Sequence, residues 1–236
     1  MLTRKHLTAS AVAVSICVGL TTLSLKAQSA TPTPIGAWFG IARPCTSGSR
    51  FQAPPGTVNQ DVCREACLGA ACPASKFPVD EVTMIPTLLA DGTVLADDFA
   101  ELLDKHTTAQ GRWEFAGKAL IGGRLFDRYQ ASFLWFAARN PQDVNPQNPL
   151  SIFNGVIRPR FVTFFDVTNP DVMQGYIQPY VYSMTDSSGI VIMQPGLPWP
   201  SIDPLGRLPV TCDPTANTNP YCAGTLTFNI RRIPAH

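Results

Sequence analysis

Apolar runs alternate with turn residues through the middle of the chain, a pattern typical of consecutive antiparallel strands. Residues 82–98 hold two apolar runs on either side of Asp91-Gly92, and a third run begins at residue 111. Asp-Gly between two apolar runs predicts a β-hairpin with a type I′ turn, because both residues tolerate positive φ. We therefore expect the central region to consist of hairpins.

The same pattern continues towards both ends of the chain. The twenty-two prolines argue against a helical protein, because proline interrupts a helix interior. Eight to ten antiparallel strands favour an up-and-down β-barrel over a sandwich, since closure removes exposed strand edges. The predicted fold class is therefore all-β. Further strands are predicted at residues 35–42, 119–130, 133–141, 152–157, 161–170, 176–184, 190–193 and 224–233, with a turn at 116–118.

Two short segments carry helical signals within this pattern. A helical turn is expected at residues 61–68. Residues 97–106 fit either a short helix or an irregular strand, because an Asp can cap a helix there and Phe99, Leu102 and His106 share one face at helical spacing.

The first thirty residues are predicted to be a secretory signal peptide. Arg4 and Lys5 precede an uncharged, apolar or small stretch at residues 9–25, and small residues follow up to Ala30. An uncleaved membrane anchor is the alternative. Cleavage leaves residues 31–236 as one barrel domain in the periplasm or outside the cell, with no membrane span.

Removing this leader changes the charge of the chain. It contains three of the eighteen Lys and Arg and none of the seventeen acids, so the mature chain has 15 basic and 17 acidic side chains and a net charge of −2. A near-neutral chain without a basic run gives no electrostatic reason to expect nucleic acid as a partner.

Six cysteines remain in the mature chain, within Pro-rich loops predicted at 43–78 and 194–222. An even number in an exported chain indicates a disulfide framework, and no metal or other cofactor is expected. The first loop allows three internal pairings, and we expect the last two cysteines to pair with each other. The six are Cys45, Cys63, Cys67, Cys72, Cys212 and Cys222.

Gly36-Ala37-Trp38 at the start of the first predicted strand resembles the Gly-x-Trp signature of lipocalins. The resemblance implies a calycin-type barrel closed at one end by Trp38, with Arg232 of the last strand packed over its ring. The wider pattern also resembles exported bacterial proteins with lipocalin-like barrels, through residues 90–94, His106 ahead of Gly111-x-Trp113, and the closing strand. The long cysteine loop departs from the lipocalin pattern.

His106 is the one mature histidine besides the terminal residue, and it follows an acidic segment. Asp97, Asp98, Glu101 or Asp104 is placed to hold it as a general acid or base. The alternative is a solvated acidic segment in which the histidine only balances charge. No nucleophile or calcium-loop motif accompanies it.

Aromatic residues form the other candidate site. Their strand positions indicate that they either fill the barrel interior or line a cavity for one apolar molecule. The candidate contact residues are Trp38, Trp113, Phe133, Trp135, Tyr180 and Tyr182.

Three functions remain open from the sequence. The leading interpretation is a secreted or periplasmic barrel that binds a small hydrophobic molecule without transforming it. The second is a cyclase or isomerase that uses the same cavity with His106 and a carboxylate. The third is a cell-envelope interaction module with a filled barrel.

Overall fold

The computed structural model describes residues 32–45, 59–76, 81–98, 106–138, 147, 153–183, 208, 211–216 and 221–234. All of them belong to the compact unit Pro32–His236. The predicted signal peptide and the strand predicted at 190–193 lie outside the described residues.

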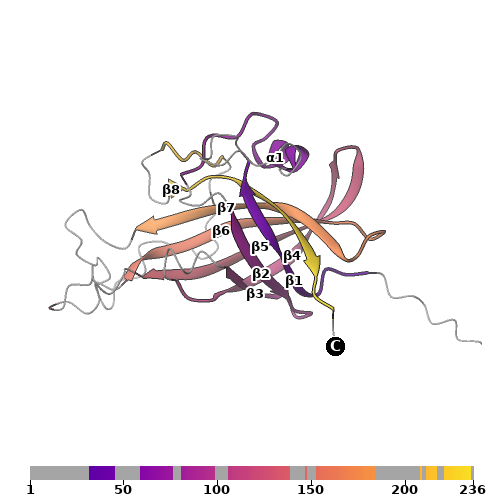
Figure 1. Cartoon of the computed structure of the whole chain (residues 1–236), viewed down its shortest axis with the longest axis horizontal. Helices are drawn as coiled ribbons and strands as arrows, with labels where there is room; N and C mark the ends of the chain where they lie inside the picture. Colours follow the sequence, from indigo (N-terminus) through magenta and orange to yellow (C-terminus); the bar gives the residue numbers. More distant parts are fainter. Residues whose placement is uncertain are drawn as a thin grey trace, which may run out of the picture. The chain divides into compact units, whose positions relative to one another are not determined.

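Eight antiparallel strands close into an up-and-down β-barrel, which confirms the predicted fold class (Figure 1). Each strand pairs with the strands before and after it, and β9 closes the barrel by pairing with both β7 and β1. The eight are β1 (Gly36–Pro44), β2 (Val82–Leu88), β3 (Thr93–Asp98), β4 (Ala109–Ile121), β5 (Arg124–Ala138), β6 (Phe153–Phe165), β7 (Val172–Ser183) and β9 (Leu226–Arg232). Two further elements are the helix α1 (Gln60–Ala66) and the short strand β8 (Tyr221–Cys222), which pairs with β7.

The β2–β3 hairpin is present, but its predicted turn type is wrong. Gly92 N–H donates to Leu89 O at 3.1 Å, Leu89 N–H donates to Thr93 O at 2.9 Å, and of the turn residues only Gly92 has positive φ, at 84°. This is a type I turn followed by a glycine bulge, which needs one left-handed residue where a type I′ turn needs two. The two-residue turn with both φ positive lies instead at Gly122 and Gly123, between β4 and β5.

Strands β4, β5, β6 and β7 are longer than the sequence predicts, and in β4 and β6 residues taken as breaks are accommodated within the sheet. The turn expected at 116–118 is an irregularity in the β4–β5 register, and β4 continues through it. Residues 153–165 form a single strand although Pro159 interrupts their apolar pattern. Pro159 lies directly opposite Pro179 of β7. The two residues that lack a backbone N–H therefore face each other, and β6 and β7 pair on both sides of them.

The barrel interior is lined by buried apolar side chains from all eight strands. Gly40 lets β1 and β9 approach closely, since a Cβ there would lie 2.5 Å from Asn229 O. The interior cluster consists of Trp38, Ala42, Val82, Met84, Leu88, Val94, Ala109, Ala131, Phe133, Trp135, Ile157, Phe161, Phe165, Met173, Leu226, Phe228 and Ile230.

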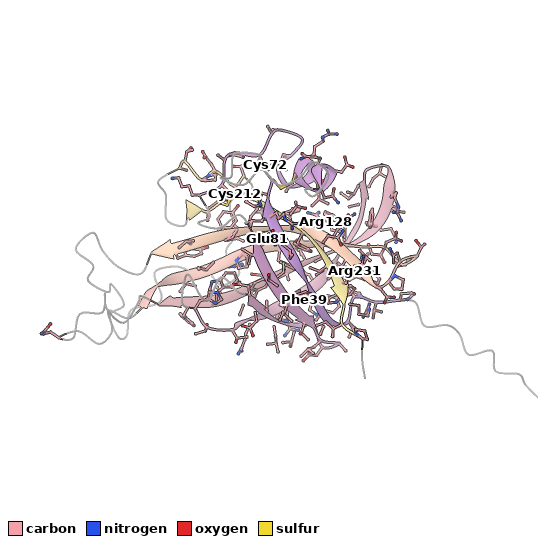
Figure 2. The ribbon with its side chains drawn as sticks, in the orientation of Figure 1. Phe39, Cys72, Glu81, Arg128, Cys212 and Arg231 are labelled. Carbon is pink, nitrogen blue, oxygen red and sulfur yellow. A yellow bond between two sulfur atoms is a disulfide. The ribbon has the colours of Figure 1, made fainter. Side chains whose placement is uncertain are left out.

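Part of the outer barrel surface is also covered. The helix α1, which confirms the helical turn expected at 61–68, places Val62 and Ala66 against the outer faces of β4 to β7. Figure 1 shows α1 and β8 on the same side of the barrel. On the uncovered side, Phe39 of β1 is 48% exposed beside its cross-strand partner Arg231 (Figure 2).

The six cysteines of the described residues all form disulfides. The expected Cys212–Cys222 pair is formed, and the first loop contains Cys45–Cys63 and Cys67–Cys72. The first of these joins the end of β1 to α1 and so holds the helix on the barrel. Oxidised cysteines are not available as zinc thiolates, and three disulfides are consistent with a non-cytoplasmic compartment.

Candidate functional site

The two ends of the barrel differ in chemistry. We call the end that holds Trp38 and Arg232 the Trp38 end, and the opposite end, which holds Asp98, His106 and Trp135, the His106 end. Since strands alternate in direction, β1, β3, β5 and β7 all run from the Trp38 end to the His106 end.

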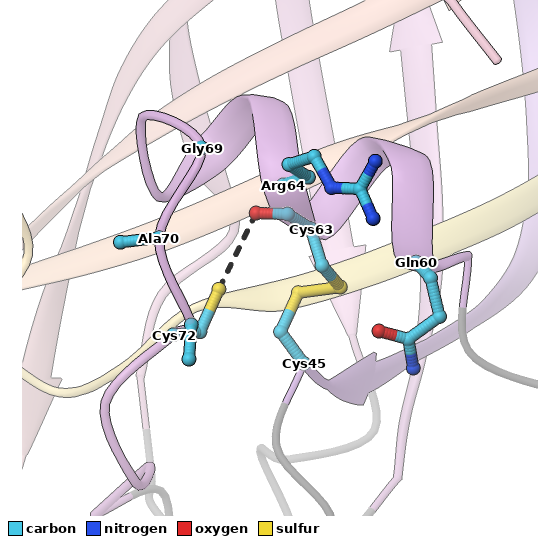
Figure 3. A pocket seen from close by; sticks show the side chains of 8 residues that line it. Cys45, Gln60, Cys63, Arg64, Gly69, Ala70 and Cys72 are labelled. Atoms are coloured by element: carbon cyan, nitrogen blue, oxygen red, sulfur yellow. Dashed lines mark hydrogen bonds between the residues drawn. A yellow bond between two sulfur atoms is a disulfide. The ribbon is translucent and has the colours of Figure 1, made fainter.

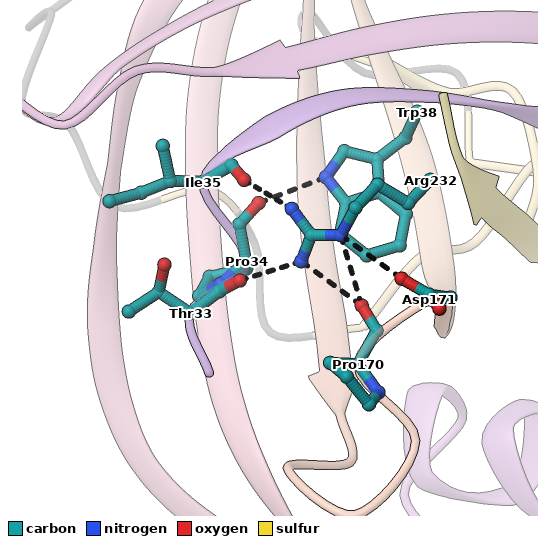
Figure 4. Close-up of polar contacts among 7 residues, drawn as sticks. All are labelled: Thr33, Pro34, Ile35, Trp38, Pro170, Asp171 and Arg232. Carbon is teal, nitrogen blue, oxygen red and sulfur yellow. Dashed lines mark hydrogen bonds and ion pairs between the residues drawn. The ribbon is translucent and has the colours of Figure 1, made fainter. Parts of the chain in front are cut away.

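The Trp38 end is closed by the contact that the lipocalin resemblance implied. Arg232 is the cross-strand partner of Trp38, and its guanidinium lies 4.5 Å from the centre of a Trp38 ring. The same guanidinium donates to the backbone carbonyls of Thr33 at 2.7 Å, of Pro170 at 3.0 and 3.2 Å, and of Ile35 (Figure 4). One cation therefore ties the N-terminal segment, the β6–β7 connection and the ring together.

The indole of Trp38 is also fully bonded. Its Nε1–H donates to Pro34 O at 2.9 Å, and its ring is 0% exposed and meets Phe165 edge-on. The Trp38 indole and the Arg232 guanidinium thus have partners within the protein, whereas Thr163 Oγ1, two residues before Phe165, has none among the described residues.

At the His106 end, a histidine and a carboxylate face the interior. Alternation along β3 places Val94, Ala96 and Asp98 on the inner face. His106 Nε2 lies 3.2 Å from Asp98 Oδ1, its Nδ1 lies 3.0 Å from Thr107 O, and its side chain is 5% exposed. Both ring nitrogens of His106 therefore lie within hydrogen-bond distance of a protein oxygen.

An aromatic wall leads from this pair towards the middle of the barrel. The His106 ring centre lies 5.4 Å from that of Trp135, and Trp135 stacks on Phe133 at 5.6 Å. Phe133 in turn contacts Phe161, which stacks on Phe228 at 4.8 Å. The wall carries one unusual polar atom: among the described residues, no acceptor lies within hydrogen-bond distance of the buried Trp135 Nε1.

Three of the predicted contact residues lie in the interior, and one lies at its edge. Trp38, Phe133 and Trp135 belong to the interior cluster. Trp113 is half-buried and packs against this cluster, and its Nε1–H donates to Leu89 O at 3.0 Å in the β2–β3 turn.

The placement of Tyr180 and Tyr182 in the interior is wrong. Both lie on the outer face of β7, where they pack with the Cys212–Cys222 disulfide. Both faces of β7 are apolar because the outer face is covered as well, so sequence alternation alone does not tell which face is internal. Burial raises the pKa of the Tyr180 phenol, and the nearby Arg160 guanidinium partly offsets this rise.

The predicted acidic partners of His106 are only partly described. Glu101 and Asp104 lie outside the described residues, as does most of the segment for which a short helix was one alternative. Among the described residues, the structure pairs His106 with Asp98 of β3, one of the four carboxylates predicted from the sequence. The inward alternation from Val94 to Asp98 is the sequence signal that favours this carboxylate over its neighbours.

A hollow of about 450 Å³ lies outside the barrel, between the first two disulfides (Figure 3). Arg64, exposed in the last turn of α1, contributes a charge to its wall. The hollow is open to solvent. Its lining residues are Cys45, Gln60, Cys63, Arg64, Gly69, Ala70, Ala71 and Cys72.

The part of the chain that the structure describes has neither a cluster of metal ligands nor a membrane-spanning helix. It contains no group of three or more histidine, cysteine or carboxylate residues placed to hold a metal ion. Nor does any helix within it have the length and apolarity to cross a membrane.

The chain matches no protein-family model, no curated protein sequence and no solved structure.

Proposed function

We propose that the protein binds a small hydrophobic molecule inside the barrel, at the His106 end, without transforming it. The observation that carries this proposal is the asymmetry of the barrel. The Trp38 end is closed by fully bonded groups, whereas a buried aromatic wall extends to the His106 end. Aromatic and aliphatic walls with few polar groups are the usual lining of small-molecule sites.

The proposal includes export of the chain and a lipocalin-like role. Its support is the signal-peptide pattern of residues 1–30, the three disulfides, and the pairing of the Gly-x-Trp tryptophan with an arginine of the last strand. A carrier outside the cytoplasm would take up a poorly soluble molecule there and shield it from water.

Two variants in which phenylalanine replaces alanine test the location of the site. The full chain, exported and purified without detergent, is titrated with N-phenyl-1-naphthylamine, whose fluorescence rises in an apolar cavity. Ala96 faces the interior from β3, so Ala96→Phe fills that space and is expected to weaken probe binding at least tenfold. Ala37→Phe adds the same ring at the Trp38 end of β1, on the outer face, and is expected to change binding less than twofold. Equal effects of the two variants would contradict the proposal.

Catalysis by the His106–Asp98 pair is the second candidate, because the pair is buried beside the aromatic wall. Both imidazole nitrogens already contact protein acceptors, so either would have to turn away from its partner to reach a substrate. The ligand recovered from the exported protein is incubated with wild type and with His106→Gln and analysed by mass spectrometry. Conversion by wild type alone would favour catalysis, and an unchanged ligand with both proteins would favour binding.

A further inference from the structure

Three tryptophans of the described chain differ in one respect. The indole nitrogens of Trp38 and Trp113 donate to the backbone carbonyls of Pro34 and Leu89, at 2.9 and 3.0 Å. The indole nitrogen of Trp135 is buried, yet no acceptor among the described residues lies within hydrogen-bond distance of it. The residue as a whole is 5% exposed.

An indole N–H can only donate, and a buried donor without an acceptor is unfavourable. The immediate neighbours of Trp135 do not relieve it. The Phe133 ring has no acceptor atom, and both His106 nitrogens are engaged with Asp98 and Thr107. Among the described residues the donor therefore has no acceptor, and it is available to a bound ligand.

Thr163 carries the other unpartnered polar atom of the interior, and it is too far away to share that group. Trp135 lies opposite Ile157 on β6, six residues before Thr163. At about 3.3 Å per residue the two levels are roughly 20 Å apart along the strand. The single polar group of a small ligand at the His106 end can meet Trp135 only.

The charges around Trp135 indicate which kind of acceptor it meets. Among the described residues facing the interior, the basic side chains are His106, already paired with Asp98, and Arg232, held by carbonyls at the opposite end. Within this described set a buried carboxylate would find no further counter-charge beside Trp135, which is costly in an apolar environment. A neutral oxygen carries no such penalty.

We propose that the ligand carries a neutral hydrogen-bond acceptor, a carbonyl or ether oxygen on an apolar frame, and that Trp135 Nε1 donates to it. This inference rests on the proposed function and adds the chemical class of the ligand and the residue that selects it. Trp135 is then the specificity-determining residue, and Phe133 and the more distant rings hold the apolar frame.

Two probes of nearly identical shape test this assignment. In 2-acetylnaphthalene a carbonyl oxygen occupies the position of the terminal CH₂ of 2-isopropenylnaphthalene. Wild type is expected to bind the ketone about tenfold more tightly than the alkene, as one added hydrogen bond implies. Trp135→Phe is expected to remove this preference, so that the variant binds the ketone and the alkene with equal affinity. Trp113→Phe removes an indole that already has a partner, and it is expected to retain the preference.

The outcomes separate the two proposals. Failure of wild type to bind either probe would overturn both the proposed function and this inference. Equal affinity for the two probes, or a preference that survives in Trp135→Phe, would leave the binding function standing and overturn the role of Trp135. A measurement on wild type does not depend on how the variants fold: the indole N–H resonance of Trp135, assigned by its loss in Trp135→Phe, is expected to move downfield with the ketone and not with the alkene.

Discussion

Each end of this barrel buries a tryptophan in the apolar interior, but the two ends differ in the hydrogen bonding of the indole N–H. At the Trp38 end the indole N–H and the Arg232 guanidinium are bonded to backbone carbonyls from two connecting segments. At the His106 end a histidine–carboxylate pair is satisfied, but the indole of Trp135 beside it is not. Under the function proposed above, the Trp38 end is a structural closure and the His106 end is the site for a ligand.

Polar groups explain the contrast better than apolar ones do. Aromatic side chains line the barrel along its whole length, from Trp38 and Phe165 to Phe133 and Trp135. Burial of these rings stabilises the fold at either end and does not by itself distinguish core from site. The two indole N–H groups do differ, because a folded chain rarely leaves a buried indole donor without an acceptor.

The largest effect is expected from Arg232→Ala at the Trp38 end. It removes the ring contact with Trp38 and leaves the carbonyls of Thr33 and Pro170 without their donor. Charged hydrogen bonds and a cation–π contact together suggest a loss of about 3 kcal/mol in unfolding free energy. Urea denaturation measures it, with the exposed Arg231→Ala as the control, for which a change within about 0.5 kcal/mol is expected. Equal losses in the two variants would show that the contacts of Arg232 at the Trp38 end add nothing to the unfolding free energy beyond those of an exposed arginine.

Arg232 could be anticipated from the sequence because its role depends on local signals. The Gly-x-Trp motif fixes Trp38 near the start of β1, and alternation along β9 places Arg232 on the same face as Phe228 and Ile230. The barrel follows from similar signals, since hairpin turns and strand alternation are local.

The His106 end could be anticipated only in part, because it depends on pairing between distant segments. Asp98 meets His106 through the paths of β3 and the chain before β4, so sequence proximity did not single it out from Asp97, Glu101 and Asp104. Tyr180 was misplaced because the covering that makes its outer face apolar comes from residues 212–222. The missing acceptor of Trp135 has no signature in the sequence at all.

His106→Gln is expected to have the next largest effect, at the opposite end. It removes the ring nitrogen that lies 3.2 Å from Asp98 Oδ1, in a carboxylate that is 18% exposed. A loss of about 2 kcal/mol is expected, below the full cost of breaking a completely buried pair. Asp98→Asn and the double variant His106→Gln/Asp98→Asn complete a double-mutant cycle in the same urea titrations, and the double variant is expected to lose less stability than the sum of the two single variants. Additive losses would argue against a direct interaction.

A smaller effect sharpens the contrast between the two tryptophans. Trp38→Phe and Trp135→Phe remove the same atoms from buried sites, but only the first breaks a hydrogen bond and strands a carbonyl. Without ligand, Trp38→Phe is expected to destabilise the protein by about 1 kcal/mol more than Trp135→Phe. Parallel thermal and urea unfolding of the two variants measures the difference. A larger loss in Trp135→Phe would indicate that its N–H has a partner in the ligand-free protein.

The smallest effect is an acid dependence at the Trp38 end, where Asp166 follows β6. The Thr168 hydroxyl, which donates to the carboxylate at 2.6 Å, lowers the pKa of Asp166, and the Thr168 N–H and Arg124 act in the same direction. A pKa lowered by folding means that the stabilisation is present above the unfolded-state value of about 4 and is lost as the pH falls through the folded-state value. Unfolding titrations at pH 6 and pH 3 should therefore show a decrease in stability, below about 1 kcal/mol for this surface group, that Asp166→Asn lacks. The same acid-induced loss in both proteins would assign the effect to other carboxylates.

Native mass spectrometry of the full chain, exported to a periplasm and purified without detergent, tests the central claim most directly. A stoichiometric extra mass that leaves on denaturation is expected, and its fragments should show an apolar molecule with a neutral oxygen acceptor. The same preparation of Ala96→Phe should lack that mass, while Ala37→Phe should retain it. An extra mass that persists in Ala96→Phe would place the ligand elsewhere on the protein. A clean apo mass for wild type, together with no binding of N-phenyl-1-naphthylamine, would contradict the account of a ligand site at the His106 end.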